Sequence, residues 1–342
     1  MTNELSIEEL RRRCVAAIQS RCSVNCRPEV LEAVNRELTL IQERNLVPFV
    51  TNAVSLARGF EDRGLAVRLV GSGCASLVNY LLGLSDVDPI RFCLPHQRFW
   101  TTNDGEAPTF LFIADLDEDA FAHRLPGLIV HKMTRLETFP FRLSAFDFPE
   151  NDDATFNQIS TGNTDGVFQL DNDAVKEIAA SFRPANLRDL ATVTALAMRQ
   201  FSDPGFVDDF LKEREERSSG NGEAAIDTTR RYVFQEELMT VLHDTFGLRW
   251  SESYLFVRDV GRKRGLGIDH PLYQKALKRA SSTETGDTQN RRLLNKLVRE
   301  SQSAVCLAHH LANAVITYRA AFLKTHDSAR FTEQLEEVTP AA

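Results

Sequence analysis

The stretch Phe110-Leu-Phe-Ile-Ala-Asp-Leu-Asp-Glu-Asp119 runs from apolar residues directly into alternating aspartates. Such an apolar run predicts a buried strand, and alternate residues of a strand point to the same face. We therefore expect Asp115 and Asp117 to project together from the end of the strand. Paired carboxylates suit hard divalent ions such as Mg²⁺, which take oxygen ligands. The alternative is an ordinary acidic turn, so the rest of the sequence has to decide between the two.

The composition predicts a folded, cytoplasmic chain. Its 342 residues, 43% of them hydrophobic, suffice for two or three domains with cores of their own. No apolar run approaches the roughly 20 residues of a membrane span, and no signal peptide is visible, so no membrane partner is expected. The net charge of −8 argues against a protein that coats nucleic acid, although it leaves room for a local basic groove.

The cysteines also favour a reduced compartment. Only two of the six lie close together, and no second close pair completes a zinc site. Scattered cysteines without a disulfide framework are typical of cytoplasmic proteins. The six residues are Cys14, Cys22, Cys26, Cys74, Cys93 and Cys306.

Hydrophobic periodicity predicts an α+β fold. A helical lead-in (1–45) precedes a mixed-sheet domain (46–150), a helical domain (151–327) and a tail (328–342) that is expected to fray. The predicted strands are 65–70, the run before Asp115, 127–131 and 141–148. Helices are predicted at 4–21, from Pro28 through Ile41, and at 49–61, 77–82, 152–160, 171–182, 186–200, 206–217, 227–246, 252–260, 272–280 and 290–324.

Three features together change the interpretation of the aspartates. A strand followed by Gly71-Ser72 and a helix lets the backbone approach a phosphate closely. Asp147, between Phe146 and Phe148, ends another predicted strand. A phosphate-binding turn, a D-x-D and a third acidic residue are the parts of a two-metal nucleotidyl transfer site.

Several further sequence segments occur in the same order as the motifs of a known protein family. They are 37–64, Gly71-Ser72 with 76–89, Gln97-Arg-Phe99, the aspartate run 115–119, Phe146-Asp147-Phe148, Thr161-Gly-Asn-Thr-Asp-Gly-Val-Phe-Gln-Leu170, 182–196, Phe234-Gln-Glu-Glu-Leu-Met239, 255–264 and 309–324. In this order they resemble the bacterial family C polymerases, the DNA polymerase III alpha subunits. The chain resembles a shortened, divergent homologue that covers the palm and the fingers.

The resemblance implies a nucleotidyltransferase palm like that of polymerase β, followed by α-helical fingers. It implies metal-dependent addition of dNTPs to a DNA 3′ end, with primer-template DNA, dNTPs and replication proteins as partners. Two Mg²⁺ ions, for which Mn²⁺ can substitute, would be held by Asp115, Asp117 and Asp147. Gly71 and Ser72 would meet the triphosphate. The implied contacts to nucleotide phosphates or template are Arg199, Arg258, Arg262, Lys263 and His309.

The sequence also departs from the family pattern. Val70 and Ala145 replace a loop arginine and a lysine beside Asp147, and Leu307 replaces another lysine. Arg68 could reach the phosphates instead. The matched blocks include no PHP, helix-hairpin-helix or OB-type module, and the segment between Asp119 and Asp147 is too short for the family's thumb. Because phosphate contacts dominate duplex affinity, we expect weak DNA binding.

Three functions remain open. The first is a minimal DNA polymerase that uses the three aspartates. The second is a catalytically weak or inactive, polymerase-derived protein that binds replication partners or DNA, which the lost cations favour. The third is a nucleotidyltransferase acting on RNA, protein or a small molecule.

Overall fold

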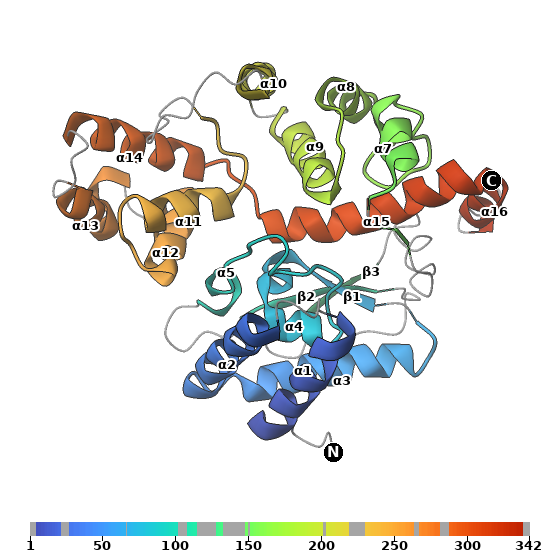
Figure 1. Cartoon of the computed structure of the whole chain (residues 1–342), viewed down its shortest axis with the longest axis horizontal. Coiled ribbons are helices and arrows are strands. Elements are labelled where there is room, and N and C mark those ends of the chain that lie inside the picture. Colours follow the sequence, from blue (N-terminus) through green and yellow to red (C-terminus); the bar gives the residue numbers. More distant parts are fainter. Residues whose placement is uncertain are drawn as a thin grey trace. The chain divides into compact units, whose positions relative to one another are not determined.

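The chain is mostly helical, with one small mixed sheet, in a computed structural model (Figure 1). The described residues are 5–21, 27–65, 67–101, 108–114, 128–132, 148–149, 151–200, 203–218, 230–262, 267–280 and 287–337. They form two compact units. Unit 1 is Met1–Ala191 with Ala308–Ala342, and unit 2 is Thr192–Leu307. The predicted α+β class is confirmed.

Unit 1 contains the sheet. Its strands are β1 (Val67–Val70), β2 (Phe110–Ala114) and β3 (Leu128–Lys132). Its helices are α1 (Ile7–Arg21), α2 (Arg27–Glu43), α3 (Val47–Glu61), the 3-10 helix η2 (Gly71–Ala75), α4 (Leu77–Leu81), α5 (Gln97–Trp100), α7 (Asp153–Ser160), α8 (Asp173–Phe182) and α16 (Ser328–Glu337). Helix α9 (Leu187–Gln200) starts in unit 1 and ends in unit 2, and α15 (Leu307–His326) lies in unit 1 apart from its first residue.

The sheet has β2 at its centre. β1 pairs with β2 antiparallel, with Val70 opposite Leu111, and β3 pairs with β2 parallel, with Lys132 opposite Ala114. Phe110 and Phe112 share one face and are fully buried, and Ile113 on the other face is also buried, as expected for a strand covered on both faces. Helices α3 and α15 lie on opposite sides of the sheet (Figure 1). The apolar run that precedes the aspartates is therefore the central strand of unit 1.

The N-terminal helices of unit 1 pack together through apolar stripes, with α1 in contact with α2 and α4, and α3 in contact with β1. Leu10, Cys14 and Ile18 form the buried stripe of α1, at the helical spacing that the sequence shows. Burial raises the pKa of the Cys14 thiol to about 12, so this cysteine stays protonated and unreactive at neutral pH. Trp100 is fully buried, and its ring contacts Phe110 edge to face with centroids 6.1 Å apart.

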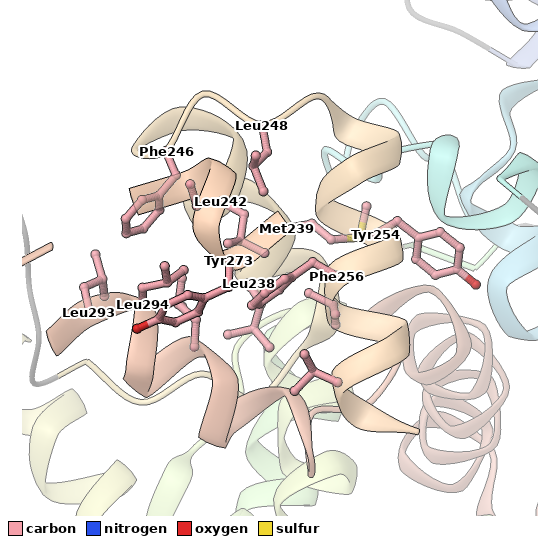
Figure 2. Packing of buried hydrophobic residues seen from close by; sticks show 14 of the residues in the cluster. Leu238, Met239, Leu242, Phe246, Leu248, Tyr254, Phe256, Tyr273, Leu293 and Leu294 are labelled. Carbon is pink, nitrogen blue, oxygen red and sulfur yellow. The ribbon is translucent and has the colours of Figure 1, made fainter. Parts of the chain in front are cut away.

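Unit 2 has a separate core. Its helices are α10 (Pro204–Ser218), α11 (Gln235–Asp244), α12 (Trp250–Gly261), the 3-10 helix η3 (Gly267–Asp269), α13 (Pro271–Ala280) and α14 (Asp287–Ser301). Leu238, Met239 and Leu242 of α11 pack against Phe256 of α12 and Leu294 of α14 in one buried cluster (Figure 2). The cluster contains enough apolar side chains to stabilise this unit by burial.

Several sequence predictions need correction. The helix expected over 290–324 is two helices, α14 and α15, with a break at 302–306. The helix expected over 227–246 begins at Gln235. The tail expected to fray contains α16, which buries Phe331. The predicted strand 141–148 lies outside the described residues apart from Phe148. Among the described residues, no helix is both long and apolar enough to cross a bilayer.

Candidate functional site

Strand β2 leads directly to the predicted metal ligands. It ends at Ala114, and Asp115 is the next residue in the chain. Asp115, Asp117 and Asp147 lie outside the described residues, as does Lys263, so their mutual placement stays a prediction. In the part of the chain that the structure describes, no group of three or more histidine, cysteine or acidic side chains could hold a metal ion.

The Gly71-Ser72 turn follows β1. Gly71 has a φ of +79°, a conformation that favours glycine, whereas the space around it would admit a Cβ. Its nearest neighbour is Leu111, near the start of β2. Along β2, Leu111 and Ala114 are roughly 10 Å apart. The Gly71-Ser72 turn therefore lies at one end of β2, and Asp115 follows the other end. A ligand that contacts both would have to span that length.

Arg68, the substitute cation that the sequence offers, belongs to an ion cluster. Its Nε lies 3.3 Å from Oδ2 of Asp86, and Nη1 of Arg319 from α15 lies 2.9 Å from the same oxygen. Burial alone would raise the pKa of Asp86, but Arg319 and then Arg68 hold it below its usual value. The cluster joins β1 to α15, so the structure gives Arg68 a carboxylate partner in place of a phosphate.

A buried carboxylate, Glu37, connects two of the family-like blocks, 37–64 and 76–89, to Trp100. Its oxygens accept hydrogen bonds from the Ser76 hydroxyl, the Leu77 backbone N–H at 3.0 Å and the Trp100 indole N–H at 2.5 Å. Ser76 in turn caps α4 by accepting from the Asn79 N–H. The order of the blocks in the sequence does not reveal that one glutamate holds them together.

The two adjacent histidines of α15 differ in environment. His310 is buried, which lowers its pKa to about 4 and keeps it neutral at pH 7. His309 is half-buried, and its Nε2 lies 3.3 Å from the Asn313 amide nitrogen. His309 thus stays a candidate contact for nucleotide phosphates or template, while the buried His310 packs in the interior of unit 1.

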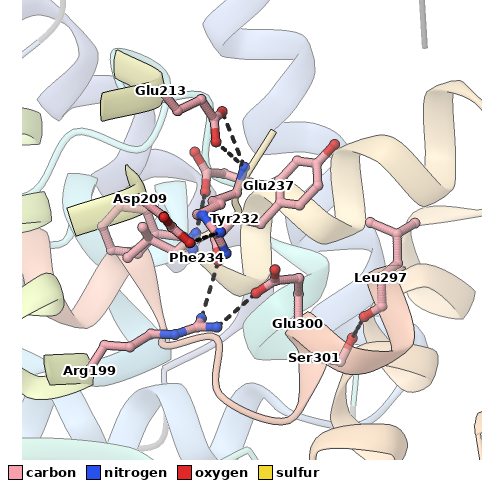
Figure 3. A network of polar contacts seen from close by, with 11 residues as sticks. Arg199, Asp209, Glu213, Tyr232, Phe234, Glu237, Leu297, Glu300 and Ser301 are labelled. Carbon is pink, nitrogen blue, oxygen red and sulfur yellow. Dashed lines mark hydrogen bonds and ion pairs between the residues drawn. The ribbon is translucent and has the colours of Figure 1, made fainter. Parts of the chain in front are cut away.

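Arg199 forms a buried ion pair in unit 2 (Figure 3). It is only 7% exposed, and its Nη2 lies 2.8 Å from Oε2 of Glu300. Nη1 donates to the Tyr232 carbonyl at 3.3 Å, and the guanidinium lies 3.6 Å from the centroid of the Phe206 ring. These partners fix α9 to α14 and to the segment before α11. They give Arg199 a structural position that differs from the phosphate contact implied by the resemblance.

The remaining basic candidates lie on α12. Arg258 is mostly buried, and its Nε donates to Oδ1 of Asp259 at 2.8 Å. Arg262 follows the last residue of α12 and is exposed. Of the described candidates, Arg262 is therefore the best placed to contact a ligand from solution.

The Phe234–Met239 block has a clear structural role. Phe234 forms a parallel bridge with Val305, and the Gln235 N–H donates to the Val305 carbonyl at 2.8 Å. Leu307, the first residue of α15, donates its backbone N–H to the buried carboxylate of Glu236 at 2.7 Å. This pairing explains the helix break that periodicity missed, because Val305 pairs with Phe234, just before α11, instead of continuing α14.

The Thr161–Leu170 block is a compact turn in unit 1. The buried Thr164 hydroxyl donates to the Leu170 carbonyl at 2.8 Å, and Gly162 and Gly166 both have positive φ. A Cβ on Gly166 would come within 2.7 Å of Leu335 in α16. The positive φ thus favours glycine here, and a larger residue would also have to displace the Leu335 side chain.

Two family models match the chain. The bacterial DNA polymerase III alpha NTPase domain matches residues 8–119, and the bacterial DNA polymerase III alpha subunit finger domain matches residues 129–282. The two matches follow one another as the resemblance implies, and together they cover most of the described structure.

Curated relatives agree with the models. DNA polymerase III subunit alpha of Thermotoga maritima is 27% identical, over 89% of this chain and 46% of that protein. The alpha subunit of Halalkalibacterium halodurans is 24% identical over 66% of this chain, and that of Mycoplasma pneumoniae is 28% identical over 54% of this chain. Each of these two proteins is matched over 21% of its own length. The chain thus spans less than half the length of these relatives.

Proposed function

Because the chain is a divergent homologue of the bacterial DNA polymerase III alpha subunit, we propose that it catalyses metal-dependent nucleotidyl transfer, adding dNTPs to a DNA 3′ end. The observation that carries the proposal is the central position of β2, which leads straight into Asp115 within the residues matched by the NTPase-domain model. In this proposal residues 46–150 act as a palm like that of polymerase β, and the helical part after residue 150 acts as fingers.

The three aspartates supply the chemistry of this proposal. Their donor set consists of carboxylate oxygens alone, which fits Mg²⁺. When bound, a pair of such ions would stabilise charge on the attacking and leaving oxygens. The chain's own part would be to hold Asp115 and Asp117 after β2, with Asp147 at the end of its own predicted strand. Gly71 and Ser72 would orient the triphosphate, and exposed Arg262, with Lys263, His309 and Arg258, would bind phosphates or template.

Primer extension tests the proposal directly. With Mg²⁺ or Mn²⁺, wild-type chain is expected to extend a labelled primer, and Asp115→Ala is expected to lose at least about 100-fold in rate, because a ligand of the metal is removed. Chelation by EDTA should abolish the wild-type signal. Asp62→Ala, a change of an exposed aspartate in unit 1, is the matched control and should keep the activity. Wild-type incorporation no higher than that of Asp115→Ala would refute polymerase activity.

The second function is supported by the partners of the arginines. Arg68 pairs with Asp86, and Arg199 is buried with Glu300, so each of these two cations already has a carboxylate partner. A polymerase-derived protein that binds replication proteins would not need them. This alternative expects pull-down of replication proteins to persist when Asp115, Asp117 and Asp147 are all changed to alanine. Loss of that binding in the triple variant would contradict it.

A further inference from the structure

Helix α15 holds the two described residues that follow Asp147 in the chain. The Phe148 ring meets Phe322 of α15 edge to face, with the ring centroids 5.3 Å apart. The carbonyl of Pro149 accepts a hydrogen bond from the hydroxyl of Tyr318, also on α15. These contacts lie within unit 1 and join two of the family-like blocks, the one around Asp147 and the one on α15.

Tyr318 is the centre of this attachment. It is only 3% exposed, and its hydroxyl also accepts the backbone N–H of Asp152 at 3.0 Å. The hydroxyl therefore both donates to and accepts from the same short segment. The Tyr318 ring stacks on Phe156 of α7, with the centroids 5.2 Å apart. Burial raises the pKa of the Tyr318 phenol, so the proton that it donates stays bound at neutral pH.

The other end of the segment is fixed by a helix cap. Oδ2 of Asp152 accepts the backbone N–H and the hydroxyl of Thr155, each at 2.7 Å, and so caps α7. The same oxygen lies 2.8 Å from Nε2 of His326, in the last turn of α15. The chain that follows Asp147 is thus attached to α15 both at Phe148 and Pro149 and again at Asp152.

This attachment restricts the position of the residue before it. Neighbouring Cα atoms of a chain are about 3.8 Å apart, so holding Phe148 also limits the space open to the backbone of Asp147. Groups that orient the ligands of a metal typically change its affinity or the activity by about 10–100-fold when they are lost. Tyr318 and Phe322 therefore have the contacts needed to act on Asp147 through the chain.

We propose that Tyr318 and Phe322 are positioning residues for Asp147, and that they act through Phe148 and Pro149. The inference rests on the proposed nucleotidyl transfer, in which Asp147 is a ligand of the metal. It gives the family-like block on α15 the task of holding the third carboxylate beside the other two.

Tyr318→Phe tests the role of the hydroxyl, because the change keeps the stacked ring. The dissociation constant for Mn²⁺, measured by EPR on the full chain, is expected to rise about tenfold, and the kcat of primer extension should fall by a similar factor. The KM for dNTP should stay the same, since no residue proposed to bind the triphosphate is changed. Phe322→Leu, which removes the ring contact with Phe148, should give the same pattern.

Tyr80→Phe is the matched control. Tyr80 is another buried tyrosine of unit 1, and its hydroxyl donates to the Arg21 carbonyl at 3.1 Å. Both Tyr→Phe changes should lower the urea midpoint of unit 1, because each removes a buried hydroxyl that is hydrogen-bonded. Only Tyr318→Phe should change the Mn²⁺ affinity and the kcat, whereas a purely structural role of Tyr318 would make the two variants alike.

The outcomes separate this inference from the proposed function. Wild-type Mn²⁺ affinity and kcat in folded Tyr318→Phe, or equal losses in Tyr80→Phe, would overturn the positioning role and leave nucleotidyl transfer in place. If wild type extended no primer, but its Mn²⁺ affinity fell in both Asp147→Ala and Tyr318→Phe, nucleotidyl transfer would be refuted and the positioning role supported. A wild-type chain that binds no Mn²⁺ would contradict both.

Discussion

Replacing Glu37 by alanine is expected to lower the free energy of unfolding of unit 1 by about 3–5 kcal/mol. The Ser76 hydroxyl, the Leu77 N–H and the Trp100 indole N–H all donate to this carboxylate inside the core. Each donor left without an acceptor costs roughly 1–3 kcal/mol. The change also leaves a cavity, so little of the loss can be recovered by relaxation.

Fluorotryptophan labelling measures this effect unit by unit. The chain has two tryptophans, Trp100 in unit 1 and Trp250 in unit 2, so ¹⁹F resonances report each unit during urea unfolding. Glu32→Ala, on the same helix but with a side chain 71% exposed, is the control and should change the free energy by no more than about 0.5 kcal/mol. Equal midpoints for Glu37→Ala and Glu32→Ala would show that the network contributes nothing.

Arg199→Ala is expected to destabilise unit 2 by a similar amount, about 3–5 kcal/mol, because it leaves the Glu300 carboxylate buried without its partner. The unfolding midpoint reported by the Trp250 resonance should shift to a lower urea concentration, while the midpoint reported by Trp100 should not change. Replacing both partners, by Arg199→Met and Glu300→Leu, should restore much of the stability, since no buried charge remains.

A pair whose arginine is exposed, and whose buried glutamate has Lys275 as a second partner, supplies the comparison for Arg199. Arg249, with a side chain 76% exposed, pairs with Glu252, and Arg249→Ala should cost no more than about 1 kcal/mol. If Arg199→Ala unfolded at the same urea concentration as Arg249→Ala, the ion pair with Glu300 would have no structural role. Arg199 would then return as a candidate contact for nucleotide phosphates.

Periodicity predicted the helices and the central strand well, because each has a clear apolar stripe or run. The α1 stripe of Leu10, Cys14 and Ile18 and the fully buried Phe110 and Phe112 are examples. The break between α14 and α15 was missed, since it depends on Val305 pairing with Phe234, about 70 residues earlier. Local sequence does not report such a distant partner.

The candidate site was harder to predict than the fold. Residue type and motif order made Arg68 and Arg199 possible phosphate contacts. The charge of an arginine does not show, however, whether a carboxylate of the same chain will pair with it in the fold. Asp86 and Glu300 lie far from them in the sequence and close in space. The aspartate site itself stays a prediction.

The contact between Asp86 and Arg319 also has a consequence for biosynthesis. The two residues are 233 positions apart, with all of unit 2 between them. At synthesis rates of about 5–20 residues per second, a ribosome needs roughly 12 to 47 s to add the second partner after the first. During that interval the sheet of unit 1 has no α15 to cover it. The nascent chain therefore exposes an incomplete unit 1 until α15 leaves the exit tunnel. We expect ribosome-associated chaperones to bind this incomplete unit.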